Sequence, residues 1–153
     1  METLLVEDDE FKAADLMRSL EKARPGLPIH RAASVTSAMR AVTASEFSLV
    51  VLDMSLPTFD LSGPGGGGSP QSQGGLEVLR LARRKNHSCP FIIVTQYPDI
   101  EIDGFDVPLA KAAAILSKKF GANVLACVAY EFDRANWRDG FQAAVMLALS
   151  ESF

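Results

Sequence analysis

The sequence predicts an α/β domain in which one parallel β-sheet is covered by helices on both faces. Short apolar runs alternate with amphipathic segments five times along the 153 residues. The central run, Phe47–Leu52 (FSLVVL), is continuously apolar, as expected of a parallel strand that is buried on both faces. Strict alternation of strands and helices favours a parallel sheet, and the length fits a single domain over residues 1–153.

Apolar periodicity and capping signals mark the first two strand-helix units. We expect a strand at residues 3–6 and a helix over residues 10–24, which Pro25 and Gly26 would end. A second strand is expected at residues 28–32, and Ser34 is placed to cap a second helix. One face of each helix is apolar: Phe11, Ala14, Met17 and Leu20 in the first, and Val35, Ala38, Met39 and Val42 in the second.

Two strands and three helices are expected after the central run. The strands are residues 90–94 (PFIIV) and 124–129 (VLACVA). The alanine-rich residues 109–116 predict a helix that ends near Phe120 and Gly121. The other two helices have apolar stripes: Leu76, Leu79 and Ala82, with Val78 beside them, in the earlier one, and Trp137, Phe141, Val145 and Ala148 in the last one.

Residues 58–75, TFDLSGPGGGGSPQSQGG, interrupt this rhythm between the third strand and the third helix. Gly, Ser and Pro dominate the segment, so it cannot form a core. We expect a flexible surface insertion, and the alternative is a lid or docking loop, because long loops inside compact domains are often functional. The segment is not a phosphate-binding P-loop, because no Gly-Lys-Ser/Thr follows the glycines.

Composition and charge argue against several classes of function. The formal net charge is −4, and basic residues cluster only at 83–85 and 118–119, which argues against direct binding of nucleic acid. No apolar run approaches the roughly 20 residues that span a membrane, and the N-terminus has no signal-peptide pattern. Cys89 and Cys127 lie in or beside apolar runs, as expected of buried thiols in a reducing compartment. We therefore expect a cytoplasmic protein.

Acidic residues follow two of the predicted strands directly. Carboxyl ends of parallel strands meet at one edge of the sheet, where open α/β sheets bind ligands. We therefore expect Glu7, Asp8 and Asp53 to lie together there, with Thr95 at the end of the fourth strand. Such carboxylates repel one another unless a hard cation joins them, which predicts a Mg²⁺ site. The residues 9–10 are instead expected in the first helical turn, where negative charge is favourable.

These motifs resemble the receiver domain of two-component response regulators. The resemblance rests on LLVEDDE, LVVLDMSLP, GLEVLR and FIIVTQY, which follow the family's order over nearly the whole chain. It implies a flavodoxin-like, doubly wound sheet with strand order 2-1-3-4-5. It also implies these roles: Asp53 is the phosphoacceptor, Asp8 a direct metal ligand, Glu7 its partner acting through water, Ser55 the donor of a backbone carbonyl to Mg²⁺, Thr95 the switch hydroxyl, and Pro57 the proline after the phosphorylation site.

The chain departs from the family at the end of the fifth strand, where receivers have a lysine. The aligned position falls near Val128, and no lysine occurs from Asn123 onward. Arg134, just after this strand, could reach inward in its place. Tyr130 could stand in for the family's aromatic switch residue.

The segment QYPDIEIDGFDVPLA after the fourth strand also differs from the family, because it replaces a short loop and an ordinary fourth helix. Receivers commonly contact partners on this face. Four aromatic residues are candidates for such a surface: Phe105, Tyr130, Phe132 and Trp137. For Phe105 and Trp137 the favoured alternative is a core or half-buried position.

Three kinds of function are compatible with this pattern. The favoured one is a stand-alone receiver that accepts a phosphoryl group on Asp53 with Mg²⁺ from a histidine kinase or phosphotransfer protein. It would signal to an unknown downstream protein and would not be an enzyme beyond its own phosphorylation and dephosphorylation. The alternative is an atypical receiver that acts as a phosphorylation-independent interaction module. A metal-dependent phosphatase is disfavoured, because Ser55 occupies the position of its second aspartate.

Overall fold

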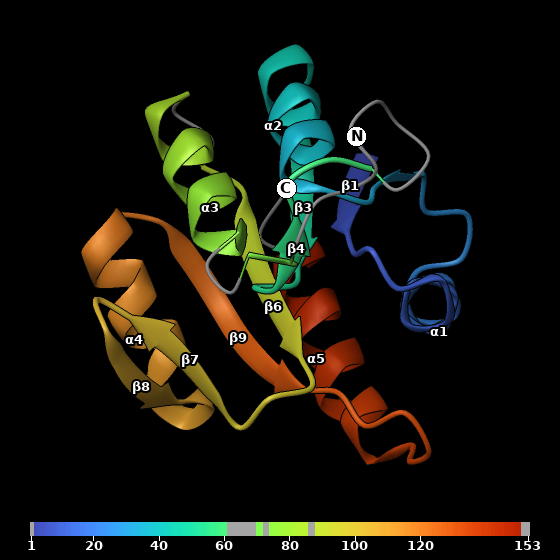
Figure 1. Ribbon diagram of the computed structural model, residues 1–153. Coiled ribbons are helices and arrows are strands. Elements are labelled where there is room, and N and C mark those ends of the chain that lie inside the picture. Colours follow the sequence, from blue (N-terminus) through green and yellow to red (C-terminus); the bar gives the residue numbers. More distant parts are fainter. Residues whose placement is uncertain (1, 61–69, 72–73, 86–87, 151–153) are drawn as a thin grey trace.

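The computed structural model describes residues 2–60, 70–71, 74–85 and 88–150. Its main sheet is parallel with the order β2-β1-β3-β6-β9, and helices cover both faces (Figure 1). This confirms the predicted order 2-1-3-4-5, since β6 and β9 are the fourth and fifth strands of this sheet. The elements are β1 (Glu2–Val6), α1 (Glu10–Ala23), β2 (Ile29–Ala32), α2 (Val35–Ala44), β3 (Phe47–Leu52), α3 (Gly74–Arg84), β6 (Pro90–Thr95), α4 (Leu109–Phe120), β9 (Asn123–Ala129) and α5 (Asn136–Ser150).

Two hydrophobic cores lie on opposite faces of the sheet. One is formed with α2, α3 and α4, and the other with α1 and α5. Successive strand residues alternate between them: Leu4 and Val6 of β1 enter the first core, and Leu5 enters the second. All of β3 is buried, as its unbroken apolar run predicts. The two cores leave only the strand ends free for polar chemistry.

The helix caps follow the sequence signals. Ser34 caps α2 in a capping box with Ser37, and α4 ends at Gly121, whose φ of 62° is the left-handed conformation that glycine favours. Asp9 caps α1 by accepting a hydrogen bond from the Lys12 backbone nitrogen at 2.9 Å. This confirms the predicted role of Asp9 in the first turn.

The predicted inner face of α1 is wrong except for Leu20, which is buried. Phe11, Ala14 and Met17 are exposed, and Phe11 stacks on Phe132 with ring centroids 4.6 Å apart. Apolar periodicity failed because half of the residues on the true inner face are polar or charged and bury their side chains against partners. That face consists of Lys12, Ala13, Asp15, Leu16, Ser19 and Leu20.

A β-hairpin interrupts the expected alternation between β6 and α4. Strands β7 (Asp99–Ile102) and β8 (Phe105–Pro108) pair antiparallel. Their turn, Asp103 and Gly104, has φ values of 54° and 81°, which an Asp-Gly pair adopts readily in a two-residue hairpin. The backbone nitrogen of Leu109 donates to the carbonyl of Pro98 at 3.3 Å and closes the base of the hairpin.

The expected insertion at residues 58–75 is shorter than predicted at its C-terminal end, because Gly74 and Gly75 already belong to α3. At its other end, β4 (Leu56–Pro57) pairs antiparallel with β5 (Pro70–Gln71). The prediction of a flexible or lid-like loop concerns residues 61–69 and 72–73, which lie outside the described part of the chain.

The four aromatic residues proposed for a partner surface divide into two groups. Trp137 and Tyr130 are 4% and 5% exposed, so the surface interpretation is wrong for both, and the core position favoured for Trp137 is confirmed. Phe105 and Phe132 are 74% and 67% exposed, so the core interpretation is wrong for Phe105. Both cysteines are half-buried free thiols, as expected. Among the helices described, none has the length and apolar character needed to cross a bilayer.

Gly75 brings α3 close to the end of β3. Its backbone nitrogen donates to the carbonyl of Met54 at 2.9 Å, and a Cβ atom there would lie 2.6 Å from the Asp53 carbonyl oxygen. We expect Gly75→Ala to lower the free energy of unfolding by about 1–3 kcal/mol, because backbone atoms cannot move aside cheaply. Denaturant unfolding measures this.

Gly140 in α5 is the matched control for Gly75, since a Cβ atom there would meet nothing within 4 Å. Gly140→Ala should raise the free energy of unfolding by about 0.5–1 kcal/mol through helix propensity. A gain of stability in Gly75→Ala like that expected for Gly140→Ala would contradict the close approach of α3 to β3.

Candidate functional site

Three carboxylates meet at the carboxyl ends of β1 and β3, as predicted. The strands are parallel neighbours in which Val6 pairs with Leu52, so Glu7, Asp8 and Asp53 leave the sheet at the same level. One carboxylate oxygen from each lies within 4.8 Å of the others. Glu7 and Asp53 are 1% and 3% exposed, and Asp8 is half-buried. We call these three residues the acidic cluster.

Burial shapes the protonation of the acidic cluster. Desolvation, followed by the charge of Asp53, raises the pKa of Glu7 to about 8. Desolvation also raises the pKa of Asp53, although Lys12 opposes the shift. Burial therefore makes the charged forms of Glu7 and Asp53 costly, and Lys12 offsets only part of that cost. The donors of the cluster are all carboxylate oxygens, which is the ligand set that Mg²⁺ prefers.

Lys12 places its ammonium group inside this site, although the sequence interpretation assigned it no role. Its Nζ lies 2.7 Å from Glu7 Oε1 and 3.3 Å from Asp53 Oδ2. It also donates to the Val94 carbonyl at 3.0 Å and to Gln96 Oε1 at 3.1 Å. The side chain is 4% exposed. One cation thus joins the ends of β1, β3 and β6.

Two other basic residues, Arg134 and Lys119, do not reach the acidic cluster. Arg134 is mostly exposed and pairs with Glu131 at 3.3 Å, so its proposed inward position is wrong. Lys119, which precedes β9, forms an ion pair with Asp103 in the hairpin turn. The signal for Lys12 was its place as the first basic residue after the acids, in the first turn of the helix that follows them.

Thr95 ends β6 next to the acidic cluster and is 1% exposed. Its hydroxyl oxygen accepts a hydrogen bond from the Tyr97 backbone nitrogen at 3.2 Å. Across the strand pair, Thr95 lies opposite Ala129, and its carbonyl accepts from the Tyr130 backbone nitrogen at 2.8 Å. The hydroxyl and the acidic cluster therefore belong to the same edge of the sheet, as predicted.

Tyr130 closes the site on the side of β9. Lys12 Nζ lies 5.7 Å from the centroid of its ring, and its hydroxyl donates to Asp15 at 3.1 Å. Burial and the hydrogen bond to Asp15 raise the pKa of Tyr130 to about 12. Asp15 also pairs with Arg138 of α5 at 3.1 Å. Tyr130 is therefore a fixed wall of the site.

Two further contacts fix the loops that carry the acids. The guanidinium of Arg31 donates to the Glu7 carbonyl at 3.0 and 3.2 Å and pairs with Glu10 at 2.8 Å, which holds the turn between β1 and α1. After β3, the Ser55 backbone nitrogen lies 3.5 Å from Asp53 Oδ1, at the outer limit of a hydrogen bond. Ser55 thus lies beside the predicted phosphoacceptor.

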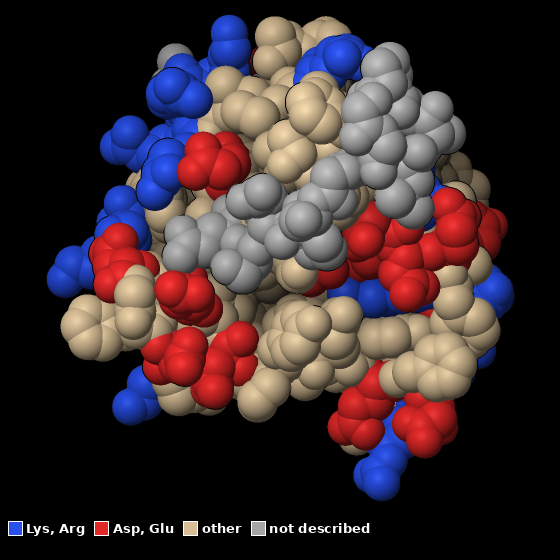
Figure 2. All heavy atoms as spheres, viewed as in Figure 1, with Lys and Arg blue, Asp and Glu red and all other residues tan. Residues whose placement is uncertain are grey.

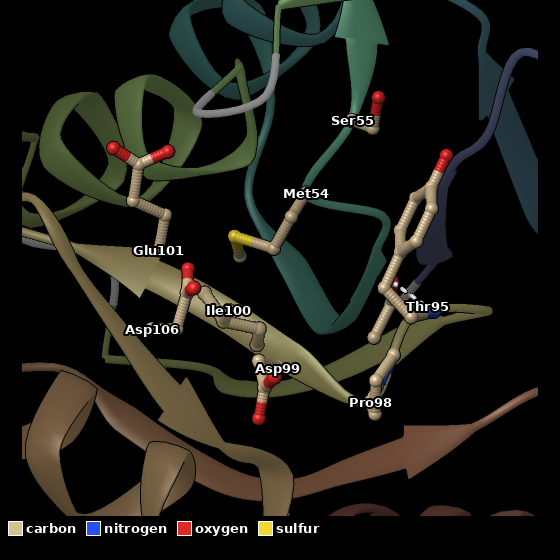
Figure 3. Close-up of a pocket in the computed structure, with 9 residues that line it drawn as sticks. Met54, Ser55, Thr95, Pro98, Asp99, Ile100, Glu101 and Asp106 are labelled. Atoms are coloured by element: carbon tan, nitrogen blue, oxygen red, sulfur yellow. Dashed lines mark hydrogen bonds between the residues drawn. The ribbon is translucent and has the colours of Figure 1, made fainter.

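A cavity of about 340 Å³ lies between the strand ends and the hairpin. Met54, Ser55 and Thr95 line it from the sheet. The opposite wall is the hairpin and the residues that lead into it, with several carboxylates among them (Figure 3). Figure 2 shows acidic side chains on this face over the segment from β1 to α1 and over the hairpin, among other places. The residues on the hairpin side of the cavity are Tyr97, Pro98, Asp99, Ile100, Glu101 and Asp106.

Comparison with known proteins points to one family. The family model of the response regulator receiver domain matches residues 3–129. The Detocs response regulatory protein DtcB of Vibrio alginolyticus is 32% identical over 138 residues, which cover 88% of this chain and 93% of that protein.

Solved structures agree with this fold. The receiver domain of response regulator 1452 of Francisella has a TM-score of 0.65 at 15% identity, covering 99% of this chain and 98% of its own. The signal receiver domain of an HD domain-containing protein from Pseudomonas fluorescens Pf-5 has a TM-score of 0.64 at 20% identity, covering 99% and 95%.

We expect Tyr130→Phe to lower the free energy of unfolding by about 1–2 kcal/mol, because it removes a buried hydrogen bond to a carboxylate. Tyr97→Phe is the matched control, since Tyr97 is 53% exposed, and its effect should stay below about 0.5 kcal/mol. Urea unfolding of both variants measures the difference. Equal effects would show that the hydroxyl of Tyr130 contributes nothing through Asp15.

Proposed function

We propose, because the chain belongs to the family of response regulator receiver domains, that it accepts a phosphoryl group on Asp53 and signals by contacting another protein. The observation that carries this proposal is the acidic cluster, in which Asp53 lies between two further carboxylates and the ammonium group of Lys12. The match to DtcB over 93% of its length supports a signalling role, since that relative is named a response regulatory protein.

The proposed reaction is a phosphoryl transfer to a carboxylate. An oxygen of Asp53 forms a bond to phosphorus while the bond from phosphorus to the donor breaks, and the electron pair of that bond stays with the donor. The donor is the phosphohistidine of a histidine kinase or phosphotransfer protein, and small acyl phosphates have the same leaving chemistry. The chain is thus a phosphoacceptor rather than a classical enzyme.

The acidic cluster is the proposed Mg²⁺ site. Asp8 and Asp53 would hold the ion directly, Glu7 through water, and Ser55 through its backbone carbonyl. When bound, Mg²⁺ neutralises charge on the phosphoryl oxygens. The burial that raises the pKa values of Glu7 and Asp53 supports this assignment, because a divalent cation would offset the cost of their charged forms.

Thr95 is the proposed switch hydroxyl. Donation from the Thr95 hydroxyl to a phosphoryl oxygen would use its hydrogen and leave its oxygen accepting from the Tyr97 nitrogen, so movement of Thr95 would carry Tyr97 with it. Movement there would reach α4 through Pro98, whose carbonyl binds the first residue of that helix, Leu109. This short path supports a signal that travels from Asp53 to the face formed by α4 and the hairpin.

A second candidate function is an interaction module that does not depend on phosphorylation. It is favoured by the two strongly exposed aromatic rings, Phe105 in the hairpin and Phe132 after β9, and by the missing lysine at the end of β9. Such rings are typical anchors of protein interfaces. The two functions differ in one respect that is easily measured, which is whether Asp53 carries a phosphoryl group.

Incubation of the chain with Mg²⁺ and acetyl phosphate should give an adduct of the mass of one phosphoryl group. Asp53→Asn should abolish it, because the amide is not a competent nucleophile, and Asp133→Asn, an exposed position, should leave it unchanged. Intact-protein mass spectrometry measures the yield. Equal adduct in wild type and Asp53→Asn would place the acceptor elsewhere, and no adduct in any variant would favour the interaction module.

Asp8→Asn should weaken Mg²⁺ binding by at least about tenfold, because it removes one charged ligand from the proposed site. Isothermal titration calorimetry measures this at neutral pH, again beside Asp133→Asn. Unchanged Mg²⁺ affinity in Asp8→Asn would rule out the acidic cluster as the metal site.

A further inference from the structure

The place of the family's strand-end lysine is filled by neutral residues in this chain. Near the aligned position, Val128 packs against the core that α1 and α5 cover. Ala129 and Tyr130 follow it, and neither is a cation. The nearest basic residue along the chain, Arg134, pairs with Glu131. The phosphoryl group proposed on Asp53 would therefore lack a cation from β9.

Lys12 approaches the same strand ends from the same face of the sheet, because α1 covers the core against which Val128 packs. We propose that Lys12 of α1 supplies the ammonium group that contacts the phosphoryl group on Asp53, in place of a lysine at the end of β9. This inference rests on the proposed function. It assigns to the first turn of a helix a role that the family gives to a strand.

A phosphoryl oxygen could take the place of one of the acceptors that Lys12 now contacts. An ammonium group has three N–H donors, and here it faces four acceptors. Glu7 and Asp53 are buried carboxyl groups at 2.7 and 3.3 Å from Nζ, and the Val94 carbonyl belongs to a buried strand. Gln96 is exposed and neutral, so its side-chain oxygen is the acceptor that a charged phosphoryl oxygen would displace most easily.

Three contacts fix the position of the Lys12 side chain. Asp9 caps α1 by accepting from the Lys12 backbone nitrogen, which fixes the start of the side chain. The Val94 carbonyl holds its end, one residue before Thr95. The ring of Tyr130 flanks Nζ, and Asp15 holds that ring in place. Lys12 and the proposed switch hydroxyl are thus anchored to one strand end, as two groups acting on one phosphoryl group require.

This role predicts opposite effects on two ligands. Lys12 repels Mg²⁺, because both are cations next to Glu7 and Asp53, but it attracts a phosphoryl group. Removal of its charge should therefore tighten the binding of Mg²⁺ alone and weaken the binding of a phosphoryl mimic. A merely structural role would weaken both together.

The test uses the full chain with Mg²⁺ alone and with Mg²⁺ plus beryllofluoride, a mimic of the phosphoryl group. Lys12→Met should weaken beryllofluoride binding by about 10- to 100-fold, as expected for loss of a charge-assisted hydrogen bond, and should tighten Mg²⁺ binding. Lys12→Arg should retain most of the beryllofluoride affinity. Lys22→Met, exposed on the same helix, is the control and should change neither affinity. Calorimetry measures both ligands, and circular dichroism checks the fold.

The outcomes separate this inference from the proposed function. If wild type binds beryllofluoride and Lys12→Met binds it equally well, the role of Lys12 is overturned and the phosphoacceptor function stands. Parallel weakening of both ligands also overturns it. No beryllofluoride complex in wild type overturns both proposals. If Lys12→Met does not fold, Lys12→Gln, which keeps an N–H donor for the Val94 carbonyl, takes its place with the same expected results.

Discussion

The ion pairs of Lys12 with Glu7 and Asp53 are the interaction on which the rest of this site depends. Two carboxylates that are almost fully buried, with a third beside them, would each be costly without a partner. Lys12 offsets part of this charge and joins three strand ends, because it also binds the carbonyl of Val94. Burial, which Lys12 offsets only in part, is what raises the pKa values of Glu7 and Asp53.

The architecture explains why these groups meet. Parallel strands with both faces buried can present polar side chains only where they end, so chemistry collects at one edge of the sheet. The close approach of Gly75 to the Asp53 carbonyl then brings α3 against the turn that holds the acid. The Asp9 cap similarly fixes the helix that delivers Lys12. Local rules of capping and close packing thus set the geometry of a site made from distant parts of the chain.

Most of the fold followed from the sequence because most strands of the main sheet are largely apolar runs and several helix ends carry capping residues. The convergence of Glu7, Asp8 and Asp53 followed from the same reasoning, since strand ends meet. Lys12 did not, because a buried lysine and aspartate on the inner face of α1 disturb the apolar period from which buried faces are inferred. The β7–β8 hairpin was also missed, although its Asp-Gly turn carries a strong hairpin signal. Its short strands lie where the family pattern expects a loop and a helix.

The hydrogen bond from the Leu109 nitrogen to the Pro98 carbonyl joins the two ends of the hairpin segment. A movement at Thr95 can therefore reach α4 through this hydrogen bond without passing along β7 and β8. Exposed residues of the hairpin, such as Phe105, can therefore be substituted during evolution without changing the positions of the residues at the strand ends. In this architecture, the exposed surface of the hairpin can diverge in sequence while the residues at the strand ends stay the same.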